Sequence, residues 1–340
     1  MALLRGAGSS LRRWIGRSTA EVDEDQGEPE IGRIREAAEA ADWAAVRDQL
    51  TERPESEDRT WLITAVARTA NVENWIPQAV EAEPDSALPL LVAGARHVNW
   101  GWEARTGARA EHVSRDQFQV FHNRLRTAEK WLYEAAEREP QWVSPWYFLQ
   151  MSGRGLQVGQ TVARRRFEAA VRRHPHHLGA HQQQLQQLCD KWGGSHEEMH
   201  AFATQALRDA PAGSMLGQLV ALAHIEQWLA LDSGADAEYL GQPGITASLT
   251  EAAERSIWHE DFAYGQGWLQ VYNTFAMVFS LTGDRDLAKL CFDGTNGIVT
   301  AFPWNYLDAA DPAAAYRENR AAAYRENRSH RSRRRHREPR

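Results

Sequence analysis

Cysteine is scarce in this sequence, and long apolar runs are missing. Cys189 and Cys291 are the only two cysteines, too few for a disulfide framework or a paired zinc-ligand motif, which favours a reducing cytoplasm. No stretch approaches the ~20 apolar residues that a membrane span needs. The first residues, MALLRGAGSSLRRWIGR, reach Arg5 after three apolar side chains and lack the apolar stretch of a secretory signal. We therefore expect a cytoplasmic protein without a transmembrane span.

Recognisable catalytic motifs are missing as well. The sequence has no phosphate loop, no dinucleotide-binding fingerprint and no serine-nucleophile elbow, the motifs whose glycines and nucleophiles would indicate a particular chemistry. No stretch alternates strictly between apolar and polar residues over the length of a strand. We therefore expect a non-enzymatic protein with no cofactor and with little or no strand.

Charge is distributed unevenly along the 340 residues, whose net charge is −7. Residues 313–340 hold ten arginines and three glutamates, a net charge of +7, which leaves −14 on residues 1–312. Near the other end, several arginines precede an acidic run from Glu21 to Glu30. Blocks of like charge are usually solvated and disordered. An acidic body also favours a basic protein or peptide as its partner.

The C-terminal segment repeats one octapeptide, AAAYRENR, at 313–320 and 321–328, before the run RSRRRHR at 331–337. Two interpretations are open: a solvated low-complexity tail, or an arm that binds anions through charge and counterion release. No aromatic side chains alternate with the arginines for base stacking, so we do not expect nucleic acid as a partner. We also expect that deleting residues 313–340 leaves the helix content nearly unchanged.

The N-terminal segment has one further possible role. Four apolar residues lie among its arginines, namely Leu4, Leu11, Trp14 and Ile15. A short basic amphipathic helix of this kind can make weak contact with a membrane surface.

Endings of the form Ala-x4-Pro recur along the chain. They are formed by Ala79 and Pro84, Ala135 and Pro140, Ala170 and Pro175, and Ala206 and Pro211. The last three prolines are 35 and 36 residues apart, a period typical of helical-repeat proteins. The clearest copy resembles the W-x2-L…A-x3-F…P pattern of tetratricopeptide repeats, with Trp146, Leu149, Ala163, Phe167, Ala170 and Pro175 in these positions.

Each residue type in this pattern has a physical reason. Small alanines let two antiparallel helices approach closely, the aromatic residue fills the gap between neighbouring hairpins, and proline ends the second helix. The pattern is degenerate elsewhere, because Pro84 and Pro140 are 56 residues apart, which indicates a longer hairpin or an insertion near 103–120. A hairpin of this size must stack on its neighbours to bury its apolar face.

We therefore expect an all-α fold, a right-handed α-solenoid of antiparallel helical hairpins with degenerate tetratricopeptide-like repeats. The expected parts are a disordered tail over 1–30, a helical-repeat domain over 31–311 and a disordered basic tail over 312–340. Within the domain, the alanine-rich stretch from Ile31 to Leu50 has helical character.

Three segments carry a resemblance to a known family: DWAAVRDQL at 42–50, KWGGSHEEM at 191–199 and AFPWNYL at 301–307. Together they resemble an actinobacterial family of tetratricopeptide-like proteins of unknown function, over roughly residues 31–307. The resemblance implies a helical fold and no assigned chemistry.

The segment HEEMH, with His196, Glu197 and His200, matches the zinc-peptidase motif H-E-x-x-H. In that motif the two histidines bind zinc and the glutamate acts as base. The surrounding residues favour a helix start instead, because Gly193 and Gly194 permit a turn, Ser195 can cap the helix and Glu198 can complete a capping box. For a zinc site with His196 and His200, Glu226 is the only acceptable candidate for the third ligand. A zinc-dependent hydrolase is therefore the alternative to our main prediction.

A second candidate metal site is the segment HPHHLGAH, where His177 and His181 share a helical face and could join Cys189. Such clusters are more often solvated turns, so we predict no metal. The main prediction is a protein–protein interaction module, with a candidate interaction surface at Lys191, Trp192, His196 and Glu197. Thirteen tryptophans between Trp43 and Trp304 either pack between hairpins or line a groove for peptide.

Overall fold

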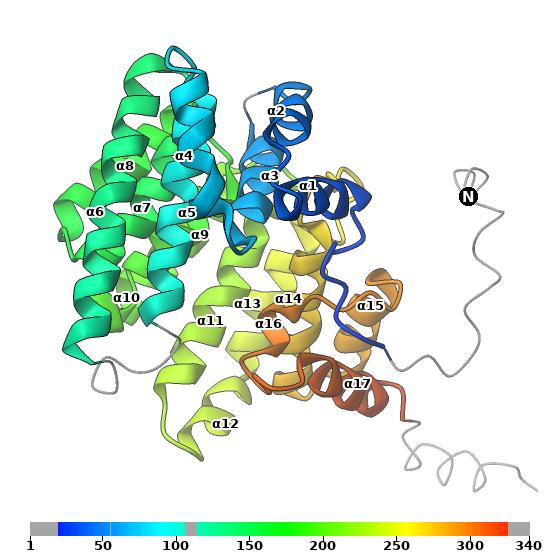
Figure 1. The fold of residues 1–340 in the computed structure, drawn as a ribbon. Coiled ribbons are helices and arrows are strands. Elements are labelled where there is room, and N and C mark those ends of the chain that lie inside the picture. Colours follow the sequence, from blue (N-terminus) through cyan, green and yellow to red (C-terminus); the bar gives the residue numbers. More distant parts are fainter. Residues whose placement is uncertain (1–19, 55, 106–113, 326–340) are drawn as a thin grey trace, which may run out of the picture.

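A computed structural model of the chain describes residues 20–54, 56–105 and 114–325, and within them it is all-helical (Figure 1). The expected all-α class is confirmed. The described residues contain no strand, only an isolated bridge between Val22 and Val299. None of the described helices combines the length and the apolar character needed to cross a membrane.

The helices form two rows that alternate along the chain. The helices of the first row contact one another in order, and they are α1 (Pro29–Glu39), α3 (Glu57–Arg68), α5 (Leu88–Arg105), α7 (Ser144–Leu156), α9 (Leu178–Gln187), α11 (Gln218–Ala230) and α14 (Trp268–Thr282). Each helix of the second row packs on one or two of these: α2 (Trp43–Thr51), α4 (Val72–Ala82), α6 (Arg115–Arg138), α8 (Gln160–Arg173), α10 (His196–Asp209), α13 (Pro243–Glu254) and α15 (Arg285–Gly294).

The remaining elements are short or lie at the end of the described chain. They are η2 (Asp190–Trp192), η3 (Met215–Gly217), α12 (Ala235–Leu240), α16 (Ala301–Trp304) and α17 (Pro312–Ala323).

Helix α6 shows how the sequence produces these elements. Ser114 accepts a hydrogen bond from the backbone N–H of Gln117, and the Gln117 side chain accepts one from the backbone N–H of Ser114, which completes a capping box. Its buried residues follow one stripe at spacings of three and four, with Phe121, Leu125, Ala128, Leu132 and Ala135 among them. The long repeat between Pro84 and Pro140 is therefore a hairpin with longer helices, whose connection at 106–113 lies outside the described residues.

The aromatic position of the clearest repeat lies between helices, as expected. Phe167 on α8 contacts His181 on α9 and Phe202 on α10, with ring centroids 5.1 and 5.5 Å apart. The stretch from Ile31 to Leu50 is helical, as expected, and is divided into α1 and α2. Between them, Ala41 has a φ of 55°, and Asp42 caps α2 by accepting from the N–H of Ala45.

The buried apolar residues form two large hydrophobic cores and a third, small cluster of Val143, Ala170 and Ala180. The first core extends from Ile31 to Leu149 and the second from Leu178 to Tyr316. Between them, the hydroxyl of Thr60 on α3 lies 2.8 Å from the hydroxyl of Ser144 and 3.1 Å from Nε2 of His177. These polar contacts join α3 to the N-terminal ends of α7 and α9.

The first described residues pack against the last ones (Figure 1). The Asp23 N–H donates to the carbonyl of Val299 at 2.8 Å, Gly267 donates to Glu28 at 2.8 Å, and Arg317 on α17 donates to the carbonyl of Ala20 at 2.6 Å. We call these contacts between residues 20–30 and 265–317 the closure.

The expected tail boundaries are therefore wrong on both sides. Residues 20–30 belong to the closure, because their acidic side chains accept hydrogen bonds from the distant α14 region. Residues 312–323 form α17, whose Tyr316 is 1% exposed and packs on Phe292 and Trp304. Residues 1–19 and 326–340 lie outside the described residues, and they include the proposed membrane-contact residues and the whole run RSRRRHR at 331–337.

Candidate functional site

The HEEMH segment begins α10, as the helix-start interpretation predicts. Ser195 is the N-cap residue, and its hydroxyl accepts a hydrogen bond from the N–H of Glu198 at 3.1 Å. The capping box is not completed, because the Glu198 carboxylate accepts from the Ser195 hydroxyl at 3.2 Å rather than from the Ser195 backbone. Met199, Ala203, Ala206 and Leu207 form the buried stripe of α10.

His200 belongs to a hydrogen-bond network that joins α10, α11 and α12. Its Nε2 lies 2.7 Å from the side-chain oxygen of Gln227, which also accepts from the hydroxyl of Tyr239 at 2.8 Å. That hydroxyl lies 2.7 Å from Nδ1 of His224. Because an amide oxygen only accepts, Nε2 of His200 carries the hydrogen and offers no lone pair to a metal. Burial lowers the pKa of His200, so the neutral ring suits this network.

Glu226 is held by other partners. Its carboxylate accepts hydrogen bonds from Lys191 Nζ at 2.6 Å, from Gln186 and from the hydroxyl of Tyr306 at 3.3 Å. The side chain is buried on α11, so Lys191 anchors the short helix η2 to α11.

The histidines of HPHHLGAH are also engaged separately. His177 caps α9 through Nδ1, which accepts from the N–H of Ala180 at 3.1 Å, and burial lowers its pKa to about 3. His181 Nδ1 lies 3.0 Å from the carbonyl of His177. Sγ of Cys189 lies 3.5 Å from Sδ of Met199, and burial raises the pKa of the Cys189 thiol to about 12. Within the described part of the chain, no three His, Cys, Asp or Glu side chains gather to hold a metal ion.

Two tryptophans and two arginines gather beside η2. The rings of Trp102 on α5 and Trp192 on η2 meet edge to face, with centroids 6.1 Å apart. Arg105 lies 5.5 Å from the Trp102 centroid and 5.9 Å from the Trp192 centroid, and Arg154 on α7 lies 5.5 and 5.8 Å from them. We call these four residues the arginine–tryptophan cluster.

Arg154 is the unusual charge of this cluster. Its guanidinium donates to the side-chain oxygen of Gln183 at 2.8 Å, and no carboxylate of the described residues forms an ion pair with it. Burial lowers its pKa to about 10. A half-buried cation without an ion pair costs free energy unless a ligand supplies the missing charge.

The structure brings only part of the candidate interaction surface to this cluster. Trp192 belongs to it and the exposed Lys191 adjoins it, whereas no hydrogen bond, ion pair or ring contact among the described residues links His196 or Glu197 to it. The other members come from α5 and α7, and sequence reasoning did not select them. The available signal was the number of tryptophans, which suggested a groove but did not say which residues line it.

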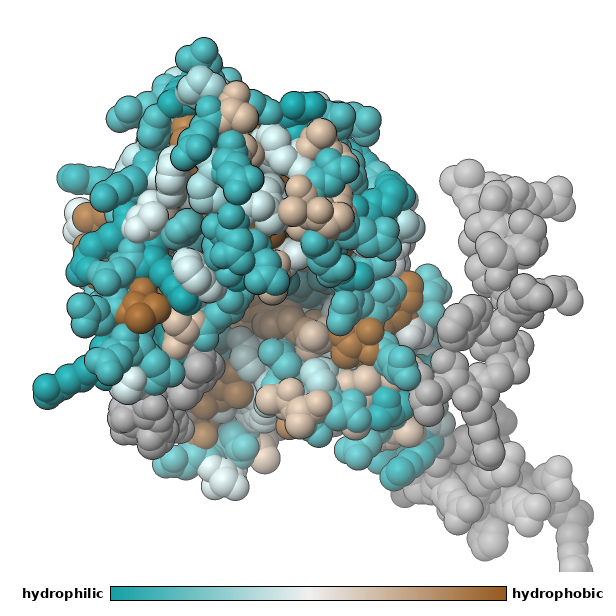
Figure 2. All heavy atoms as spheres, viewed as in Figure 1, coloured by the Kyte–Doolittle hydropathy of each residue, from teal (hydrophilic) through white to brown (hydrophobic). Residues whose placement is uncertain are grey.

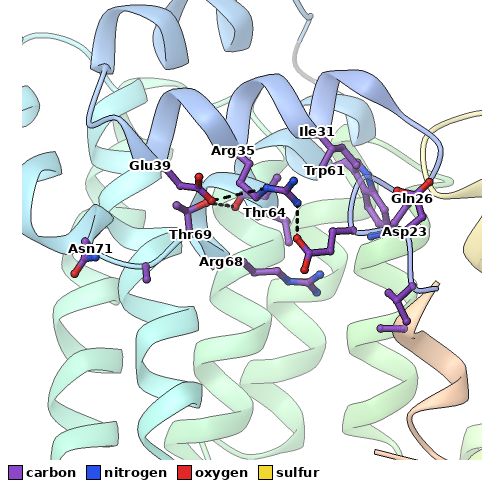
Figure 3. A pocket seen from close by; sticks show the side chains of 15 residues that line it. Asp23, Gln26, Ile31, Arg35, Glu39, Trp61, Thr64, Arg68, Thr69 and Asn71 are labelled. Atoms are coloured by element: carbon purple, nitrogen blue, oxygen red, sulfur yellow. Dashed lines mark hydrogen bonds and ion pairs between the residues drawn. The ribbon is translucent and has the colours of Figure 1, made fainter. Parts of the chain in front are cut away.

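A cavity of about 600 Å³ lies elsewhere, beneath α1 (Figure 3). Its walls are the segment 22–26, α1, α3, the loop at 69–71 and Ala301. Figure 2 shows the surface hollowed at this place, with hydrophobic residues at the floor. The closure therefore forms one side of the cavity.

A comparison with models of known protein families gives no match to the chain, and a comparison with curated proteins gives none either.

Proposed function

We propose that the protein is a non-enzymatic interaction module that binds a protein or peptide partner. In this proposal the two helix rows form a right-handed α-solenoid of degenerate tetratricopeptide-like hairpins. The alternation of rows and the buried alanines at 128, 135, 163 and 170 support it, because small residues let paired helices approach closely. Membership of the actinobacterial family suggested by three sequence segments stays a prediction.

The observation that carries the proposal is the arginine–tryptophan cluster. Tryptophan and arginine are the residues that contribute most often to hot spots of protein interfaces. Here they converge from α5, α7 and η2, and no described carboxylate forms an ion pair with Arg154. The acidic body as a whole favours basic partners, whereas the cluster itself favours an acidic side chain on the contacting segment.

The test is a quantitative pull-down with the full-length protein from its native lysate. Trp192→Ala and Arg154→Gln are expected to reduce recovery of the main partner at least about tenfold, because truncated hot-spot residues often cost 2 kcal/mol or more. Trp100→Ala is the matched control, because Trp100 also stacks with an arginine, Arg124 at 3.4 Å, but lies outside the cluster. Equal recovery by wild type and the two cluster variants would contradict the proposal.

The alternative, a zinc hydrolase that uses His196, Glu197 and His200, is tested by metal analysis of the purified protein. We expect no stoichiometric zinc. Stoichiometric zinc that is absent from the His200→Ala variant, together with a hydrolytic activity of the wild type, would contradict the interaction module and support the hydrolase.

A further inference from the structure

The cavity beneath α1 contains two arginines with different surroundings. Arg35 on α1 contacts three carboxylates, those of Glu24 at 3.0 Å, Asp25 at 3.0 Å and Glu39 at 3.9 Å. Arg68, in the last turn of α3, is exposed and makes no hydrogen bond or ion pair with any described residue. Figure 3 shows its side chain extending along the cavity below Arg35. One cation of the cavity is therefore free to bind an anionic group.

Two buried polar atoms of lining residues also have no partner among the described residues. They are Nε1 of Trp61, which can only donate, and the side-chain oxygen of Gln26, which can only accept. A buried polar atom left without a hydrogen bond costs about 1–3 kcal/mol. Both atoms lie beneath the cavity lining, and a small rotation of either side chain brings a donor and an acceptor to the cavity that match the C=O and N–H of a peptide bond.

The charge, apolar surface and volume of the cavity restrict the class of ligand further. The three carboxylates that contact Arg35 outnumber its single charge, and two of them, Glu24 and Glu39, line the cavity together with Asp23. This wall therefore attracts an ammonium group and repels a second anion. Val22, Ile31, Ala65 and Ala301 supply apolar surface. A volume of about 600 Å³ lies within the range of small-molecule sites and exceeds what a single amino acid fills.

We propose that this cavity binds a short apolar peptide with free ends, a dipeptide or tripeptide. The ligand carboxylate pairs with Arg68, and its ammonium group lies near the wall formed by Glu24 and Glu39. Its amide group bonds to Trp61 and Gln26 once these side chains turn toward the cavity. Its apolar side chains contact Val22 and Ile31. This site is separate from the arginine–tryptophan cluster and does not depend on the function proposed for that cluster.

The test is calorimetric titration of the full-length protein with leucyl-leucine. Binding is expected for this dipeptide and at least about tenfold weaker binding for its C-terminal amide and its N-acetyl form, since each removes one charge-assisted contact. Arg68→Gln is expected to weaken leucyl-leucine binding by a similar factor. The matched control is Arg208→Gln, because Arg208 is also an exposed arginine in the last turn of its helix, α10.

A second variant tests the amide contact. Trp61→Phe keeps an aromatic ring but removes the N–H donor, so it should weaken binding of leucyl-leucine about three- to tenfold, as expected for one hydrogen bond, and leave the weaker binding of free leucine unchanged. No binding of leucyl-leucine at millimolar concentration would overturn the proposal. Equal affinity for the dipeptide and its C-terminal amide, or equal effects of Arg68→Gln and Arg208→Gln, would overturn it too.

Discussion

At the scale of single residues, the repeated octapeptide AAAYRENR offers a comparison within one chain. Its first tyrosine, Tyr316, is 1% exposed and its hydroxyl lies 2.8 Å from that of Thr295. Its second tyrosine, Tyr324, is 37% exposed and contacts Asp293, Lys289 and Arg320. Identical local sequence thus leads to two different environments, because only the first copy faces Phe292 and Trp304.

The two tyrosines therefore differ in their expected contribution to stability. Tyr316→Ala should lower the free energy of unfolding by about 3–5 kcal/mol, as large-to-small changes of buried aromatic residues do. Tyr324→Ala should lower it by less than about 1 kcal/mol. Urea denaturation of both variants measures the difference, and equal midpoints would contradict the packing of α17. The same packing reverses our expectation that residues 313–340 can be deleted without loss of helix.

At the scale of elements, Arg96 ties three helices together. This arginine of α5 is 1% exposed and donates to Glu73 on α4 at 2.6 Å, to the carbonyl of Ala67 on α3 at 3.0 Å and to Glu103 at 2.6 Å. Arg96→Ala should lower the free energy of unfolding by about 3–5 kcal/mol, because it removes the charge that pairs with Glu73.

A partner substitution separates pairing from packing in this network. If Glu73 is changed to Gln in the Arg96→Ala background, the mostly buried Glu73 site no longer holds a carboxylate without its cation, and only the exposed Glu103 carboxylate loses its partner. Part of the lost stability should therefore return. Chemical denaturation of the two single variants and the double variant gives the coupling free energy between Arg96 and Glu73. Strictly additive effects would mean that Arg96 stabilises α4 only by its volume.

The junction of α3 with α9 predicts a dependence on pH. The Glu57 carboxylate on α3 accepts from the N–H of Gly179 at 3.0 Å, yet burial outweighs this and raises its pKa from 4.5 to about 7. The folded state then binds the proton more tightly than the unfolded state. The stabilising effect is complete below pH 4.5 and is lost as the pH rises to about 7.

This dependence can be assigned to Glu57 by substitution. Glu57→Gln keeps an oxygen that can accept from Gly179 but cannot ionise, so its unfolding free energy should fall less than that of the wild type between pH 4.5 and 7. Denaturation at several pH values measures both slopes, with Glu197→Gln on the exposed start of α10 as control. Parallel curves for wild type and Glu57→Gln would contradict the raised pKa.

The helices themselves followed largely from the sequence. Stripes such as that of Met199 to Leu207 and the cap at Ser195 depend on near neighbours, which periodicity detects. The predictions from the sequence were wrong where contacts between distant parts of the chain determine the structure. The closure at residues 20–30 and the packing of α17 depend on partners far along the chain, such as Gly267 and Ala20, so local charge alone predicted tails.

At the scale of the whole molecule, the closure can be tested at one glycine. Gly27 has a φ of 75°, and a Cβ there would lie 2.6 Å from Cδ1 of the buried Leu269 on α14. Gly283 has a similar φ of 80°, but a Cβ there would meet nothing within 4 Å. Both Gly→Ala changes strain the backbone, and only Gly27→Ala also overpacks the closure.

Gly27→Ala should therefore lower the free energy of unfolding by about 1–3 kcal/mol more than Gly283→Ala, the usual cost of overpacking. Thermal or urea denaturation of the two variants measures this difference. If the two variants have equal stability, residues 20–30 do not pack on α14 in solution.

The candidate sites were less predictable than the fold. Lys191 and Trp192 were selected from the sequence, but Trp102, Arg105 and Arg154 reach Trp192 only because α5, α7 and η2 are neighbours in space. The cavity beneath α1 likewise joins Val22, Arg68 and Ala301, which no sequence spacing connects. Sites assembled from separate helices need the packing of the whole chain before they can be recognised.

The closure also bears on how the protein fluctuates. In a linear array of helical hairpins, the first and last units have a neighbour on one side only, so their ends fray and their amide hydrogens exchange first. Here α17 holds the carbonyl of Ala20, and the segment before α1 pairs with Val299. The amides of α1 and α17 should therefore exchange slowly and together, through one larger opening that releases both ends of the described chain at once.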